Sequence, residues 1–250
     1  MAPRVPVRSA VVGVDGSANS QAALAWARDV VGPDGSIREV HADEDPAQRL
    51  LRAAADMDAD IVVIGVHTQS PLPPKRLGSV GKQLLSHTDR PVAVVGADHD
   101  RTDAPSTVVA GVGYGGATRA ALAWSASWAE THGTALELIR AIPNRPVFRT
   151  DGLLDVLAFY IDRDMARDWA MDDIQAVADE IQASTDEELS ISWSAPRGGT
   201  GPTLVDASDG ASLLVVGLHE ADRPDIAGWL HHALTHAPCP VVVVPVPTAG

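Results

Sequence analysis

Cysteine, lysine and long apolar runs are scarce in this chain of 250 residues. A single cysteine, Cys239, cannot form an internal disulfide, so we expect a cytoplasmic protein. The apolar runs, such as Ile61–Ile64 and Val241–Val244, are far shorter than the roughly 20 residues of a membrane span. The first residues also lack the apolar core of a signal peptide. We therefore expect neither a membrane segment nor secretion.

Basic residues are also few, with 19 Lys and Arg against 33 Asp and Glu and a formal net charge of −14. A net negative charge of this size repels the phosphate backbone of nucleic acids, so we expect no nucleic-acid partner. A small anionic ligand is compatible with this charge, because the N-terminus of a helix binds phosphate through its backbone N–H groups.

Blocks of sequence recur in the same order in two halves of the chain. The matching pairs are residues 10–27 with 108–124, 60–67 with 212–219, and 90–95 with 239–244. A repeat of this length indicates duplicated structural units. We predict two tandem domains, residues 1–98 and 108–250, joined by a polar linker at 99–107.

Apolar strand patterns alternate with helical patterns in each half, which predicts parallel sheets joined by crossover helices. Strands are expected at 10–14, 36–42, 61–65 and 92–95, and in the second half at 108–112, 135–141, 189–195, 213–217 and 241–244. The predicted fold is α/β, with two tandem Rossmann-like or flavodoxin-like domains, the first truncated by about one strand–helix unit at its edge. A long helix is expected over 162–184, with its inward positions at Met165, Trp169, Ile174, Val177 and Ile181.

Glycines surround the loop that follows the third predicted strand. This loop begins with Gly65-Val-His-Thr and returns after nine residues to Gly78-Ser-Val at the start of a helix. A loop between a parallel strand and a helix N-terminus can hold phosphate. We expect the N–H groups of Ser79 and Val80 to face the phosphate, with Lys75 and Arg76 adding positive charge.

An aspartate, Asp15, follows the first predicted strand in Gly-Val-Asp-Gly-Ser. Together with the glycine motif, this pattern resembles the universal stress protein family, whose ATP-binding members carry Gly-x2-Gly-x9-Gly-Ser/Thr and an early aspartate. Thr68 stands where the family has its second glycine. The resemblance implies ATP, with or without Mg, bound in the first half, with Val14 and Asp15 beside adenine and ribose and Val40 at adenine. The full candidate set is Val14, Asp15, Val40, Gly65, His67, Thr68, Arg76, Gly78, Ser79 and Val80.

The second half departs from this pattern. Gly113 stands in place of the aspartate, Glu220 in place of the second glycine, and Ala227-Gly228 in place of Gly-Ser. We expect this half to keep the fold without a cofactor, with Trp229 filling the space of the nucleotide. The resemblance further implies that the two halves pair through their last strands as an intramolecular pseudo-dimer, with Val92–Val95 beside Val241–Val244. A further homodimer is left open.

The resulting prediction is an adenine-nucleotide-binding stress-response protein that acts on an unknown regulatory partner. No catalytic residue or metal site is assigned, so enzymatic activity is at most a slow ATPase. One alternative is a nucleotide-free scaffold that acts by protein–protein contact.

A second alternative is an NAD(P)-binding oxidoreductase that uses Gly111–Gly116, which fits Gly-x-Gly-x-x-Gly. That fingerprint requires an acidic residue about 20 positions later, where Arg140 and Ala141 stand.

Several other residues have simpler interpretations. Ser17 is interpreted as a helix cap, and Trp26 and Trp124 as anchors of the core or of the domain interface. A histidine cluster, His231, His232 and His236, is interpreted as a solvated helix end.

Overall fold

The computed structural model describes residues 7–41, 44–66, 77–97, 107–113, 116–142, 163–185, 189–220, 226 and 228–246. In the first half the elements are β1 (Ser9–Val14), α1 (Ala18–Val31), β2 (Ser36–His41), α2 (Pro46–Met57), β3 (Ile61–Gly65), α3 (Ser79–His87) and β4 (Val92–Val95). In the second half they are β5 (Val108–Gly111), α4 (Gly116–His132), β6 (Leu136–Ile139), α6 (Arg163–Ser184), β7 (Ile191–Ser194), α7 (Thr200–Ala207), β8 (Leu213–Leu218), α8 (Gly228–His236) and β9 (Val241–Pro245). Each half thus alternates strands and helices, and the predicted α/β fold is confirmed.

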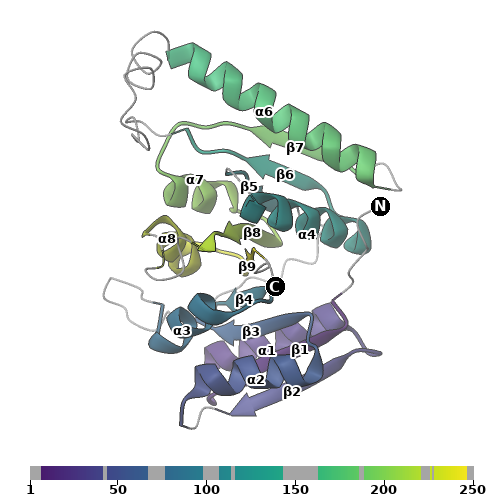
Figure 1. Cartoon of the computed structure of the whole chain (residues 1–250), viewed down its shortest axis with the longest axis vertical. Coiled ribbons are helices and arrows are strands. Elements are labelled where there is room, and N and C mark those ends of the chain that lie inside the picture. The colour runs from purple at the N-terminus through teal and green to yellow at the C-terminus, as the bar shows by residue number, and fades with distance from the viewer. Residues whose placement is uncertain are drawn as a thin grey trace.

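The nine strands of the described residues form one sheet in the order β2-β1-β3-β4-β9-β8-β5-β6-β7. Neighbouring strands within each half are parallel, as short apolar strands joined by helices require. The two halves meet where β4 pairs antiparallel with β9, and Ala93 faces Val242. The expected pairing of Val92–Val95 with Val241–Val244 is therefore present. Figure 1 shows the first half below this junction and the second half above it.

The two halves differ in size as the sequence predicts. The first contributes four strands to the sheet and the second five. The additional strand, β7, lies at the outer edge of the second half, and α6 is the crossover helix that leads to it. In the described part of the first half, nothing follows β2 outward in this way. Loss at an edge leaves the central strand pairings intact.

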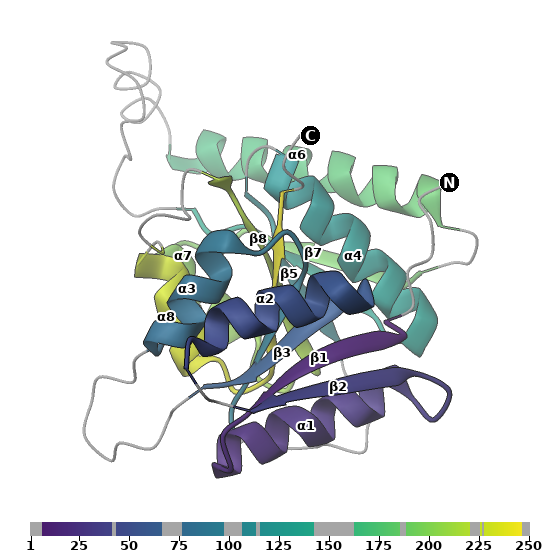
Figure 2. The ribbon, with the colours of Figure 1, turned by 60° about the horizontal axis from the view of Figure 1, so that its bottom comes forward.

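Helices cover both faces of the sheet, and a separate core lies on each. One core joins α1, α4 and α6 to the sheet through residues such as Ala23, Leu122 and Ile174. The other joins α2, α3, α7 and α8 through residues such as Leu50 and Leu230. Figure 2 shows α1 on one side of the first-half strands and α2 on the other. Both cores draw residues from both halves, so the halves share their interior.

Stacked tryptophans form part of the contact between the halves. Trp26 on α1 and Trp128 on α4 are both buried, and their rings stack with centroids 6.0 Å apart and planes 6° apart. Trp124, one turn earlier on α4, stacks on Trp128 at 5.1 Å. The predicted role of Trp26 and Trp124 as anchors agrees with this arrangement, and Trp128 completes it.

One prediction for the long helix is wrong. The sequence pattern predicts that Trp169 points inward, whereas in the structure Trp169 is 54% exposed. The buried face of α6 follows Ala170, Ile174, Ala178 and Ile181, whose spacing of four, four and three residues leaves Trp169 on the solvent side. Val177 is half-buried against the same core.

Parts of other predictions lie outside the described residues. These are the Met165 side chain and the linker at 99–107 apart from Thr107. Among the helices that the structure describes, none has the length and apolar character needed to cross a membrane.

Candidate functional site

The candidate site lies where the strand order of the first half reverses direction. From β1 the chain moves outward to β2 and then returns through α2 to β3 on the other side of β1. In doubly wound α/β sheets, ligands bind outside the carboxyl ends of the strands at such a point. The turn after β1 and the start of α3 both lie at this edge.

A cavity of about 230 Å³ occupies this position. Its lining includes all seven candidate residues that the structure describes, namely Val14, Asp15, Val40, Gly65, Gly78, Ser79 and Val80. The other three candidates, His67, Thr68 and Arg76, lie outside the described residues, as does Lys75. The fold thus brings together residues from four separate segments of the chain.

Apolar side chains outside the sequence motifs complete the walls of the cavity. Pro46 and Leu50 come from α2, Ile64 from β3, and Leu77 from the segment before α3. Leu50 is fully buried and contacts the core beneath the cavity. Its place on the apolar face of the amphipathic helix α2 is the signal that could have identified it.

The turn between β1 and α1 is held by a short network of hydrogen bonds. The Ser17 N–H donates to Asp15 Oδ1 at 2.9 Å, and the Ser20 N–H donates to Ser17 Oγ at 3.2 Å. The predicted capping role of Ser17 is confirmed. Gly16 has a φ of +79°, which favours glycine at this position. The network fixes the exposed Asp15 at the mouth of the cavity.

The start of α3 is open on the side of the cavity. Gly78 is the N-cap residue, and no side chain caps the helix. A Cβ built on Gly78 would meet no atom within 4 Å, so the space in front of the helix is accessible. Backbone N–H groups in the first turn of a helix lack intrahelical partners and carry a partial positive charge. This end of α3 can therefore accept an anion.

Gly65 has a packing role in addition to its place in the motif. A Cβ at this position would lie 2.6 Å from the carbonyl carbon of Asn19 and 2.8 Å from the N atom of Ser20. Only glycine lets α1 pass this closely over the end of β3. Gly65 thus sets the position of α1 relative to the cavity floor.

The equivalent region of the second half is packed more tightly. A Cβ on Gly201 at the start of α7 would lie 2.8 Å from the Trp229 carbonyl oxygen at the start of α8. Trp229 is half-buried and packs against the core on this face. Close approach of α7 and α8 leaves little room between them.

The remaining motifs of the second half show structural contacts. Arg140, which stands where a dinucleotide site needs an acid, is buried, and its Nη1 lies 2.8 Å from Asp173 Oδ2. His232 and His236 stack at 4.2 Å, and burial together with the charge of His236 lowers the pKa of His232. Within the described ranges, no three His, Cys, Asp or Glu side chains form a group able to hold a metal.

These features define a doubly wound α/β protein with a candidate ligand cavity at the switch point of its first half. Residues 28–96 match the universal stress protein family. The chain therefore carries a universal stress protein domain in its first half. No curated protein sequence matches the chain.

Solved structures share the fold over nearly the whole chain. A universal stress protein from Archaeoglobus fulgidus DSM 4304 is 12% identical, with a TM-score of 0.61 over 96% of this chain and 97% of that one. A putative universal stress protein from Pseudomonas aeruginosa UCBPP-PA14 is 16% identical, with a TM-score of 0.55 over 95% and 82% of the two chains. The cytoplasmic domain of a prokaryotic cation chloride cotransporter is 11% identical, with a TM-score of 0.54 over 94% of each chain. At these identities the likeness concerns the fold alone.

Proposed function

We propose that the first half binds an adenine nucleotide, ATP above all, and that the protein acts as a cytoplasmic stress-response regulator. One observation carries the proposal: the seven described candidate residues line a single cavity at the switch point. The universal stress protein domain over residues 28–96 lends further support.

The chemistry of the cavity suits the parts of a nucleotide. Val40 and Leu50 offer apolar walls for the adenine ring. Asp15 at the mouth can accept hydrogen bonds from ribose hydroxyls. At about 230 Å³ the cavity is smaller than the roughly 300–1,000 Å³ of typical ligand pockets, so we place the phosphates at its edge, where Gly78, Ser79 and Val80 line the wall. There the N–H groups of Ser79 and Val80 would receive them.

The proposal assigns the nucleotide to the first half alone. The close approach of Gly201 to the Trp229 carbonyl supports this choice, because the corresponding space in the second half is narrow. The loss of an aspartate at Gly113 points the same way.

Isothermal titration calorimetry with ATP, AMP, NAD and NADP, with and without Mg, tests the proposal. Asp15→Ala should weaken ATP binding about tenfold or more, because a hydrogen bond to a charged group is lost. Gly78→Val should preserve the fold, because a Cβ at this position meets no atom within 4 Å. It should abolish ATP binding, because the added side chain occupies the space in front of α3 that the phosphates need. Gly228→Val is the matched control, since Gly228 begins α8 and is equally unobstructed.

Each result has a defined meaning. ATP binding that survives both Asp15→Ala and Gly78→Val refutes the proposed site. If Gly228→Val alone removes binding, the nucleotide lies in the second half. Absence of any nucleotide, in solution and in the extract of denatured protein, favours a scaffold. An NADP signal lost on Gly113→Val favours the oxidoreductase.

A further inference from the structure

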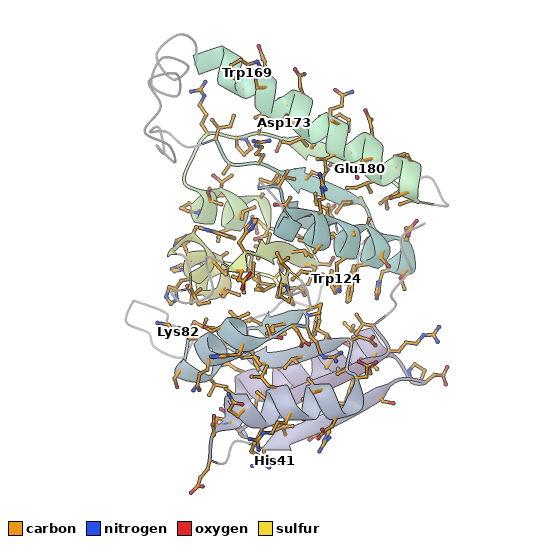
Figure 3. All side chains as sticks on the ribbon, viewed as in Figure 1. His41, Lys82, Trp124, Trp169, Asp173 and Glu180 are labelled. Carbon is orange, nitrogen blue, oxygen red and sulfur yellow. The ribbon has the colours of Figure 1, made fainter. Side chains whose placement is uncertain are left out.

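A second and larger cavity lies in the second half, between α4 and α6. It has a volume of about 480 Å³, within the range of small-molecule sites. The cavity reaches the carboxyl end of β5 at Val112 and Gly113 but does not include the cavity of the first half. Figure 3 shows the two helices, with Trp124 on α4 and Asp173 and Glu180 on α6.

The walls between the helices are mostly apolar. Leu122, Ala123 and Ala126 lie along α4, and Ala176, Val177 and Ile181 lie along α6. Ala123 and Ala176 are exposed, so the cavity is a groove open to solvent. An apolar molecule with one accessible end suits this shape.

The two ends of the groove differ in charge. Because β5, β6 and β7 are parallel neighbours, the crossover helices α4 and α6 both run back against the strands and end at the same side. Glu130 and Glu180 lie near these two C-termini. The negative ends of the helix dipoles add to the carboxylates and favour a cation there.

One carboxylate at this end lacks a donor. In the described part of the structure, Glu130 Oε1 is buried and has no hydrogen-bond partner. Buried polar atoms are nearly always hydrogen-bonded, so such an oxygen needs an explanation. At the opposite end, by contrast, Arg140 forms an ion pair with Asp173. Arg119, in the first turn of α4, also lines the groove, far from Glu130 along the helix. Within the described lining, the buried polar atom without a partner is Glu130 Oε1, and it requires a hydrogen-bond donor.

We propose that this groove binds a small molecule with an apolar body and one ammonium or amidinium group, which Glu130 and Glu180 receive. The apolar body lies between Ala123 on α4 and Ala176 on α6. The net charge of −14 also favours a cationic ligand over an anionic one.

Calorimetric titration of the full chain with hexylammonium, hexanoate and hexanol tests the charge preference. We expect hexylammonium to bind at least about tenfold more tightly than the other two, because only it donates charged hydrogen bonds. Glu130→Gln should remove most of this preference. Asp179→Asn changes an exposed acid of α6 that neighbours Glu180 in sequence and does not line the groove, and it should leave the preference unchanged.

Two substitutions of alanine by phenylalanine on α6 test whether the ligand binds in the groove. Ala176→Phe should block the groove, whereas Ala183→Phe changes another exposed alanine of α6 outside it. Thermal unfolding of each variant verifies the fold, and if Ala176→Phe fails to fold, Glu130→Gln decides the question. Equal or tighter binding of hexanoate, or no binding of hexylammonium at millimolar concentration, overturns the proposal. Gly78→Val should leave hexylammonium binding unchanged, which separates this site from the proposed nucleotide site.

Discussion

Replacing the stacked tryptophans by leucine should show that the two halves unfold together. Trp26 belongs to α1 of the first half and Trp128 to α4 of the second, and their rings stack at 6.0 Å. Leucine keeps an apolar side chain at each position and removes the aromatic contact. The pair is thus a direct probe of coupling across the junction.

The expected loss of unfolding free energy follows from the burial of the two tryptophans and from the contact between their rings. Truncation of a buried tryptophan to alanine costs about 3–5 kcal/mol, and leucine should recover part of this loss. An aromatic pair contributes about 0.5–1.5 kcal/mol beyond its buried area. A double-mutant cycle on Trp26 and Trp128 should therefore give a coupling of about 0.5–1.5 kcal/mol. Trp128→Leu should cost more than Trp26→Leu, because Trp128 also stacks on Trp124.

Urea unfolding monitored by far-UV circular dichroism provides the free energies without relying on tryptophan fluorescence. Trp169→Leu is the matched control, and since Trp169 is 54% exposed we expect a change within about 0.5 kcal/mol. A coupling indistinguishable from zero would refute the reasoning. Two separate unfolding transitions in urea, of which Trp26→Leu shifts only one, would also refute it.

Three further predictions concern local contacts. Gly65→Ala should destabilise the fold by about 1–3 kcal/mol in urea unfolding, because its Cβ would meet backbone of α1 at 2.6 Å, whereas Gly78→Ala should have little effect. Asp60→Ala should cost about 1–3 kcal/mol, because Asp60 Oδ2 accepts hydrogen bonds from the N–H and hydroxyl of Ser9 at 2.9 and 2.8 Å; a loss below 0.5 kcal/mol on the same assay would contradict this. Burial raises the pKa of the Cys239 thiol to about 12, so the unfolded chain, with a thiol pKa of about 8.5, releases its proton first as the pH rises. The Cys239 contribution to stability should therefore be fully present below about pH 8.5 and be lost above it at up to about 1.4 kcal/mol per pH unit, a slope that Cys239→Ala should remove.

Much of the fold could be predicted because the information is local or repeated. The strands Ile61–Gly65 and Val92–Val95 have the predicted bounds, since short apolar runs bordered by polar residues define buried strands. The missing edge unit of the first half followed from comparing the two repeats. Duplication supplied an internal reference that a single domain would have lacked.

The predictions for individual tryptophans fail where the packing of a helix against its neighbours decides which side chains are buried. Trp169 is apolar and lies within the helical period, but the core contact of α6 falls on Ala170 and Ile174, and the sequence does not show which stripe meets the sheet. The role of Trp128 was missed because only Trp26 and Trp124 match in the repeat. Its position four residues after Trp124, on the same helix face, was the available signal.

Of the two cavities, the sequence predicts the one in the first half and not the groove in the second half. The motif residues of the first half could be assembled because their strands end at a common edge. The groove between α4 and α6 depends on the distance between two helices and on the unpaired Glu130 Oε1, which no sequence pattern reports.

The antiparallel junction of β4 with β9 has a consequence for self-association. A half of this kind standing alone would present an edge of unpaired, almost wholly apolar strand, and such edges template the addition of further chains. Here each half terminates the other. The edges that remain in the described sheet are β2, which carries Arg38 and Glu39, and β7, which is four residues long and carries two serines. Charged and short edge strands resist strand addition. Because the apolar edge strands of the two duplicated halves pair with each other, the edge strands that remain disfavour the growth of fibres.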